Sequence, residues 1–315
     1  MFRLAIVKPI SFAVFRELIH STLLILILSL FIFLLLFMSP GDYVMQEYLL
    51  LLMENQGIEN PIPEKLSFLD SYFLWFMSFI TGNFGISSSN GMPVMDQILG
   101  YTFNTLLIIV SALVISLLVA LPIALLTTNN KLKILSQPTN VLLHLLSVLP
   151  LFWLSYIAIY YSGKWFNFFP LASDFDDLTL SQFILPVLLL SLGSGVLIEV
   201  IQLISSELRR VLNEEYVLYA RAKGASMMRH ATKEGIIFPV LTLFSNRLAY
   251  LFGASIIVEQ IFNWPGLGRI IWRSAQDRDV ALLLSAVLVS ATLIRFTHFI
   301  TRLMYILLNP RASHQ

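Results

Sequence analysis

The sequence predicts an all-α integral membrane protein with six transmembrane helices. Only 12% of its 315 residues are charged, about half the share of roughly 25% found in soluble domains. Hydrophobic residues make up 57% and the mean hydropathy is +0.80, so the charge available could not cover the surface of a soluble protein of this size. The third observation is a series of apolar runs long enough to cross a bilayer.

The first and strongest apolar run extends from Leu18 to Met38 and contains no Asp, Glu, Lys or Arg. At about 1.5 Å per residue it crosses a hydrocarbon core roughly 30 Å thick. It is longer than the core of a signal peptide and no A-x-A-like cleavage site follows it, so we interpret it as a retained span. The further predicted spans are 103–126, 141–161, 183–204, 236–258 and 281–307.

A long segment between the first two spans, about 39–101, is acidic and is predicted to lie outside. It carries seven acidic residues and one base, Lys65. Within it, Phe68–Ile80 is aromatic and too short to span, which indicates an interfacial or re-entrant helix.

The distribution of Lys and Arg predicts the orientation, because positively charged loops stay in the cytoplasm. With the N-terminus inside, the inner segments hold twelve bases and the outer loops hold five. Both termini are therefore expected in the cytoplasm of a bacterial inner membrane protein. The predicted organisation is an N-terminal segment 1–17, a permease domain 18–308 and a tail 309–315.

The inner loop at about 205–235 is the longest and most charged of the inner loops. Glu214 and Glu215 precede a helix-forming stretch, and Arg221 and Lys223 stand near its expected end, in keeping with the helix dipole. Gly224 is a natural residue to follow a helix C-terminus. Small residues there would let the helix enter a groove on a partner, although any amphipathic loop of a membrane protein has a similar composition.

This loop resembles the EAA loop of ABC importer permeases. The matching features are the string ARAKG at 220–224 and Pro239, fifteen residues after Gly224. In that family the loop forms a coupling helix that inserts into the ATPase subunit. The resemblance implies an ATPase-coupling role for Glu215, Tyr216, Ala220, Arg221, Ala222, Lys223, Gly224 and Pro239.

The rest of the chain is similar to the dipeptide/oligopeptide/nickel permeases, and most of all to the Sap-type peptide permeases. The strongest match is the stretch 259–269 after the fifth span, EQIFNWPGLGR. Further matches are Pro40-Gly41-Asp42, GNFGIS at 82–87, Pro150-Leu151-Phe152-Trp153 and Asn309-Pro310-Arg311.

This resemblance implies a type I ABC importer permease fold that moves peptides or peptide-like solutes. Antimicrobial peptides, haem and polyamines are all admissible substrates of Sap-type relatives. It also implies a second, homologous permease, two ATPase subunits that hold ATP and Mg, and a periplasmic substrate-binding protein. The sequence departs from its relatives at Gln202, Ser205, His298 and Arg302. These differences bear on which substrate is moved and leave the expected fold unchanged.

Several polar residues lie within the predicted spans, where an ionisable group costs roughly 2.5–3.5 kcal/mol and needs a partner, water or a function. Glu199, Gln202 and Ser206 share one face of the fourth span; Arg295, His298 and Arg302 repeat that spacing on the sixth. The hypothesis is that these faces line a translocation cavity and that Glu199 pairs with Arg247 or Arg295. A structural ion pair, or contact with the second permease, explains the same residues equally well.

Other function classes find little support. The net charge is only +1 without a basic block interleaved with aromatics, so no nucleic-acid partner is expected. Cysteine is absent, there is no P-loop of the form GxxxxGK[ST], and the histidines lack metal-ligand spacing. We therefore expect no catalytic residue, metal or cofactor in this chain. A proton-coupled secondary transporter, using Glu199 or His298, and a non-transporting membrane scaffold are the alternatives.

Overall fold

The computed structural model describes residues 2–38, 67–128, 133–172, 179–215, 219, 222–224, 236 and 238–308. Its named elements are all helices. They are α1 (Phe2–Phe37), α3 (Phe68–Ile80), α4 (Val94–Thr128), α5 (Lys133–Val148), α6 (Leu151–Phe166), α7 (Leu180–Gly193), α8 (Val196–Leu212), α11 (Phe238–Ile261), α12 (Leu267–Asp277) and α13 (Val280–Leu308). The prediction of an all-helical fold is confirmed for the described part of the chain.

Three described helices are long and apolar enough to cross a membrane. They are residues 14–37 of α1, the whole of α4 and residues 280–304 of α13. Counting each of the two bent pairs, α5 with α6 and α7 with α8, as one span gives up to five. The fifth predicted span, 236–258, falls largely on α11, which has 24 residues. The total of six spans stays a prediction.

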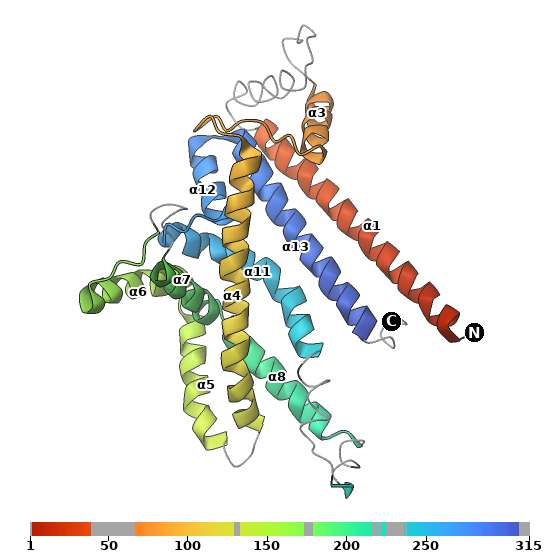
Figure 1. The fold of residues 1–315 in the computed structure, drawn as a ribbon, viewed down its shortest axis with the longest axis vertical. Helices are drawn as coiled ribbons and strands as arrows, with labels where there is room; N and C mark the ends of the chain where they lie inside the picture. Colours follow the sequence, from red (N-terminus) through yellow and green to blue (C-terminus); the bar gives the residue numbers. More distant parts are fainter. Residues whose placement is uncertain are drawn as a thin grey trace.

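The helices pack around two adjoining apolar cores. The larger core joins α4, α7, α8 and α11 through residues such as Ile108, Val187, Ile201 and Leu251. The smaller core joins α1, α3 and α13 around Phe33, Trp75 and Leu284. α1 packs mainly on α13, and the two run antiparallel, so that the start of α1 and the end of α13 lie at the same end of this pair (Figure 1).

The third predicted span is not a straight helix. The chain turns by 103° between α5 and α6, and α6 leaves the long axis of the bundle sideways (Figure 1). Pro150 stands at this corner with φ −58° and ψ 130°. A proline disfavours helical geometry at the residue before it, here Leu149. The prediction of one continuous span at 141–161 was therefore wrong in shape.

The fourth predicted span is also broken. α7 and α8 meet at an angle of 53°, and Gly195 at the junction has φ +77°, a conformation that glycine adopts without steric cost. A Cβ on neighbouring Gly193 would lie 2.8 Å from Leu151 Cδ1. The glycine pair therefore provides both a break in the span and a close approach to α6.

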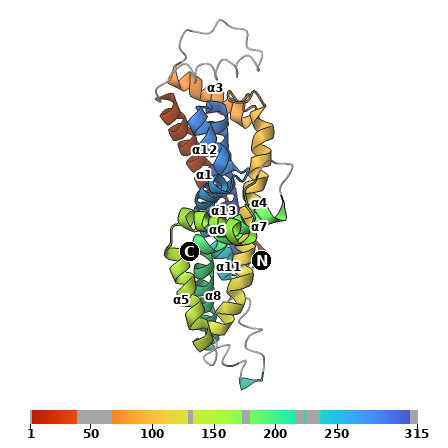
Figure 2. The ribbon, with the colours of Figure 1, turned by 90° about the vertical axis from the view of Figure 1, so that its left-hand side faces the viewer.

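Two of the segments predicted to lie outside are found at one end of the molecule. α3 and α12 lie at this end, whereas α5 and the end of α8 lie at the other (Figures 1 and 2). Asp279 joins two of the outer segments, because its buried carboxylate accepts hydrogen bonds from Ser87 Oγ and from Ser89 Oγ, the latter at 2.9 Å. The α12 helix is a feature that the sequence prediction missed.

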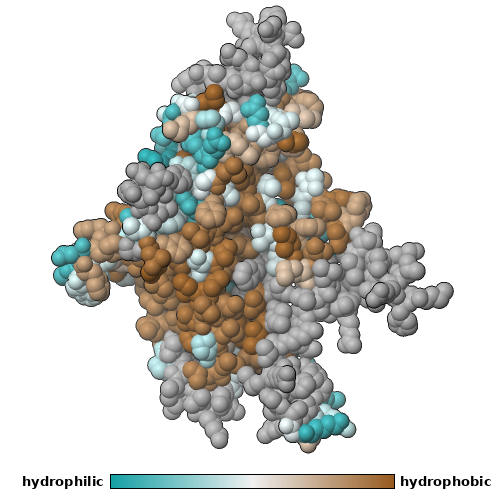
Figure 3. Space-filling view, in the orientation of Figure 1, coloured by the Kyte–Doolittle hydropathy of each residue, from teal (hydrophilic) through white to brown (hydrophobic). Residues whose placement is uncertain are grey.

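The side of the bundle seen in Figure 3 is apolar over α4 and α5, while polar side chains gather at the end that carries α3 and α12. α4 exposes a complete apolar stripe made by Phe103, Leu107, Val110, Val114 and Leu118. Such a surface is too large for a monomer in water and indicates contact with lipid or with other membrane-embedded chains.

Candidate functional site

An ion pair joins α8 to α11 within the bundle. Glu199 Oε1 contacts Arg247 Nη2, and both side chains are about one-third exposed, at 35% and 34%. The second carboxylate oxygen of Glu199 is buried without a hydrogen-bond partner in the described part of the chain. Arg247 also lies near the ring of Tyr250, with 5.7 Å between the guanidinium carbon and the ring centroid. The predicted pairing of Glu199 with Arg247 is confirmed.

The break at Gly195 explains why Glu199 stands where it does. Glu199 falls in the first turn of α8, and its amide donates to the carbonyl of Gly195 at 3.2 Å. The first turn of a helix carries partial positive charge from its unpaired amides, which stabilises a carboxylate there. A continuous helix through 193–196 would remove this stabilisation.

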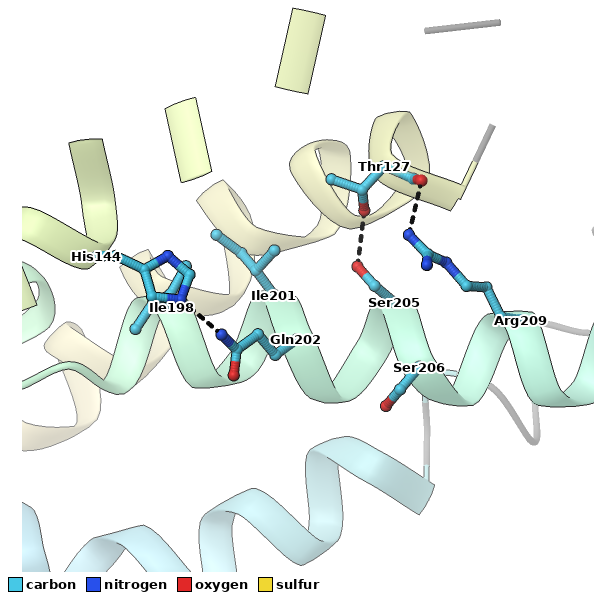
Figure 4. Close-up of a pocket in the computed structure, with 8 residues that line it drawn as sticks. All are labelled: Thr127, His144, Ile198, Ile201, Gln202, Ser205, Ser206 and Arg209. Carbon is cyan, nitrogen blue, oxygen red and sulfur yellow. Dashed lines mark hydrogen bonds between the residues drawn. The ribbon is translucent and has the colours of Figure 1, made fainter. Parts of the chain in front are cut away.

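A polar pocket lies nearby, between α4, α5 and α8 (Figure 4). It has a volume of about 470 Å³ and is lined by Thr127, His144, Ile198, Ile201, Gln202, Ser205, Ser206 and Arg209. Gln202 and Ser206 of the predicted polar face are therefore pocket residues. Glu199 and Arg247 are not among the lining residues.

Hydrogen bonds fix the walls of this pocket. Gln202 Nε2 and His144 Nε2 lie 2.8 Å apart, and the hydroxyls of Thr127 and Ser205 lie 2.8 Å apart. Arg209 Nη2 donates to the carbonyl of Thr127 at 3.0 Å, as Figure 4 shows. The pocket thus offers hydroxyls, an amide, an imidazole and a guanidinium, groups that bind polar solutes by hydrogen bonds and charge.

The other two predicted cavity residues lie elsewhere. Arg295 of α13 does not reach Glu199; its Nη2 lies 3.7 Å from Glu17 Oε1 on α1 and donates to Ser21 Oγ at 3.0 Å. His298 lies on α13 within electrostatic reach of Arg295 and Glu17. Among the described residues the sixth-span face packs against α1, away from the pocket residues, and the shared cavity stays a hypothesis.

The loop with the predicted coupling residues is described in part. Glu215 is helical but is separated from α8 by a turn at 213–214. Tyr216, Ala220 and Arg221 lie outside the described residues, as do the side chains of 237–239, which include Pro239. The amide of Lys223 donates to the carbonyl of Tyr219 at 3.2 Å, and Gly224 has φ +76°. This is the geometry of a helical turn that ends at a glycine.

The turn after α11 is built around a buried carboxylate, Glu259. Its Oε1 accepts from Thr105 Oγ1 at 2.7 Å and its Oε2 from the amide of Arg269 at 3.1 Å. Thr105 Oγ1 in turn accepts from the amide of Leu267 at 2.7 Å. A Cβ on Gly268 would lie 2.6 Å from Ile256 Cα. This carboxylate therefore holds the stretch 264–269 against α4 and α11.

Sequence reasoning missed several residues that the structure brings into these sites. His144 was considered only as a metal ligand, and Thr127 and Arg209 lie just beyond the ends of predicted spans. Glu17 directly precedes the first apolar run and was not predicted as a site residue. Arg295 and Arg302, which lie within the sixth predicted span, indicated that a carboxylate was needed as their counter-charge. Among the described residues no group of His, Asp and Glu could hold a metal ion.

A bundle with an apolar outer stripe, two broken spans, an intramembrane ion pair and a polar pocket defines a multi-pass membrane protein of the kind that serves transport. Residues 120–314 match the family described as "Binding-protein-dependent transport system inner membrane component". The chain belongs to this family, which confirms the resemblance to ABC importer permeases.

Similar proteins match between about three quarters and nearly all of the chain. The oligopeptide transport system permease protein AppB of Bacillus subtilis is 28% identical over 254 residues, covering 77% of this chain and 80% of that protein. The nickel import system permease protein NikB of Staphylococcus aureus (strain MRSA252) is 28% identical over 312 residues, covering 96% and 92%. A putative peptide permease protein of Brucella suis is 26% identical over 313 residues, covering 92% and 95%.

Proposed function

We propose that this chain is one permease subunit of an ATP-driven ABC transporter that moves peptides or peptide-like solutes across a bacterial inner membrane. The observation that carries the proposal is the family match over residues 120–314, which includes the loop that ends a helical turn at Gly224. Two of the relatives named above are described as peptide or oligopeptide permeases. ATP and Mg bind to two separate ATPase subunits, and a second permease and a periplasmic binding protein complete the assembly.

Two groups of residues serve the solute and the energy input in this proposal. Gln202 lines the polar pocket, and the Glu199–Arg247 pair holds α8 against α11 beside it. The turn around Lys223 and Gly224 docks into an ATPase subunit. Closure of the ATPases then moves this turn and, through α8 and α11, changes the side to which the cavity opens.

The membrane placement belongs to the same proposal. One permease domain spans 18–308 with six crossings, of which α11 is the fifth; its 24 residues reach about 36 Å. Both termini lie in the cytoplasm, together with the loop 205–235. The positions of α3 and α12 at one end and of the end of α8 at the other support this arrangement.

The experiment that tests the proposal is a pull-down of tagged full-length protein from detergent-solubilised native membranes, with ATPase activity read in the eluate. Wild type is compared with Gly224→Asp and with the control Gly91→Asp. Both glycines have positive φ, +76° and +69°, and open space where a Cβ would be added, so both substitutions impose similar backbone strain. Only Gly224 lies in the proposed docking turn.

We expect an active ATPase to co-purify with wild type and Gly91→Asp and to be lost from Gly224→Asp, while all three proteins remain in the membrane. Equal retention by Gly224→Asp would contradict the docking role of this turn. A wild-type protein that purifies alone and inactive would favour a proton-coupled secondary transporter or a scaffold, and Glu199 would be the next residue to change.

A further inference from the structure

A charge cluster joins α1 to α13, away from the pocket and the ion pair of α8. Glu17 Oε1 lies 3.7 Å from Arg295 Nη2, and Glu17 Oε2 lies 3.4 Å from Arg302 Nε. One carboxylate is therefore shared by two guanidinium groups. The Glu17 side chain is mostly buried, whereas the Arg302 side chain is 52% exposed.

The cluster carries more positive than negative charge. Glu17 neutralises one of the two arginines, and Arg16, the next residue on α1, is exposed. Arg302 uses Nε for Glu17, and among the described residues its two terminal nitrogens have no other acceptor. The Nε of Arg295 is buried and likewise without a hydrogen-bond partner in the described part of the chain. Titratable His298 lies near enough to interact electrostatically with Glu17 and Arg295 and adds no negative charge.

The cluster lies at one edge of the hydrocarbon core. The run Leu18–Met38, which starts directly after Glu17 and has no Asp, Glu, Lys or Arg, is about as long as this core is thick. The same stretches of α1 and α13 expose large apolar side chains, namely Phe15, Leu18 and Ile19 on α1 and Phe296, Ile300 and Met304 on α13. Surplus guanidinium charge therefore stands beside apolar surface at the depth where lipid headgroups begin.

We propose that Arg302, with the Glu17–Arg295 pair behind it, binds the phosphate of an anionic phospholipid whose acyl chains lie along α1 and α13. A guanidinium binds phosphate with two parallel hydrogen bonds, and basic sites between transmembrane helices are suited to anionic headgroups. The adjacent apolar side chains favour a lipid over a free phosphate. Lipid binding at this site does not depend on the transported solute or on the ATPases, so it is tested independently of the proposed function.

The test uses the purified full-length protein, with any subunits that co-purify, in micelles containing equal amounts of phosphatidylglycerol and phosphatidylcholine. Native mass spectrometry gives the ratio of the two lipids that stay bound. Arg302→Gln is compared with Arg210→Gln, a matched control because Arg210 is also exposed, at 58%, and also contacts a glutamate, Glu207, at 2.8 Å.

We expect wild type and Arg210→Gln to retain phosphatidylglycerol preferentially. In Arg302→Gln the ratio of bound phosphatidylglycerol to bound phosphatidylcholine should fall about five-fold, which is the effect of one basic residue at an anionic membrane surface. Glu17→Gln frees both arginines and should raise the preference; if that variant does not fold, Arg302→Gln decides. Unchanged preference in Arg302→Gln, an equal loss in Arg210→Gln, or a lower preference in a folded Glu17→Gln would each overturn the proposal. Displacement of the lipid by millimolar glycerol phosphate would also overturn it, by showing a site for free phosphate.

Discussion

At the scale of single residues, Glu199 and Arg247 make a strong test of how charge is tolerated inside the bundle. Both side chains lie in predicted spans and contact each other, so removal of one leaves the other without its counter-charge. Such a change costs more than removal of both, because an unpaired charge must be neutralised or hydrated.

We therefore predict that Glu199→Gln and Arg247→Gln each lower thermal stability, whereas the double variant loses less than the sum of the two. The coupling energy should be about 0.5–3 kcal/mol, measured by thermal unfolding in detergent. The pair Arg210 and Glu207, three residues apart on α8 and with the Arg210 side chain 58% exposed, provides the comparison and should couple by less than about 1 kcal/mol. Strict additivity at Glu199 and Arg247 would show that their contact does not stabilise the protein.

Close packing predicts a second residue effect, at Gly268. A Cβ there would meet the Cα of Ile256 at 2.6 Å, and a backbone atom within a helix cannot move aside easily. Gly268→Ala should cost about 1–3 kcal/mol, as overpacking does. Gly253→Ala in α11 is the control, since nothing lies within 4 Å of its added Cβ; a helical glycine replaced by alanine is stabilising by up to about 1 kcal/mol. Equal unfolding temperatures for the two variants would contradict this reading of the turn.

The ion pairs also show which side-chain partners could be predicted from the sequence and which could not. Glu199 and Arg247 were predicted to pair because two opposite charges in apolar helices have few other partners. The same argument offered Arg295 as a partner of Glu199 and was wrong there, because Glu17, at the edge of its apolar run, was closer to Arg295 in space. Helical spacing tells which residues share a face, but not which helix that face meets.

At the scale of elements, helix positions were predictable and helix directions were not. The apolar runs located α1, α4, α11 and α13, and the aromatic stretch at 68–80 coincided with α3. Pro150 and Gly195 marked possible interruptions, yet nothing local in the sequence gives a bend of 103° at one and 53° at the other. Those angles depend on how α6 and α7 pack. α12 was missed, although Leu267, Ile270 and Ser274 follow helical spacing and are buried.

The bend between α5 and α6 gives a prediction for Pro150→Ala. The chain has no cysteine, so spin labels can be placed by Leu142→Cys and Trp165→Cys, both at exposed positions. In a straight helix these positions would lie about 35 Å apart, and the bend brings them closer. Pulsed electron paramagnetic resonance should show a longer or broader distance distribution once proline is removed, since Leu149 is then free to be helical. An unchanged distribution would mean that contacts of α6 with α7 hold the corner.

At the scale of the whole molecule, the arrangement of the helix ends predicts sidedness. Asn90 lies at the end of the bundle with α3 and α12, whereas Glu215 follows α8 at the other end, and both are exposed. With Asn90→Cys, an impermeant thiol reagent should label intact spheroplasts. With Glu215→Cys, labelling should require permeabilised membranes, and the cysteine-free parent gives the background. Labelling of both variants in intact spheroplasts would contradict the proposed orientation.

The pairing of α1 with α13 has a consequence for biosynthesis. Glu17 is synthesised long before the arginines that contact it, which are at 295 and 302. A growing chain that ends before Arg295 contains Glu17 without either arginine, and α1 without the helix on which it mainly packs. The α1–α13 pair can therefore form only after α13 has been synthesised, and a chain terminated before Arg295 would carry an unmatched carboxylate that exposes it to membrane proteases.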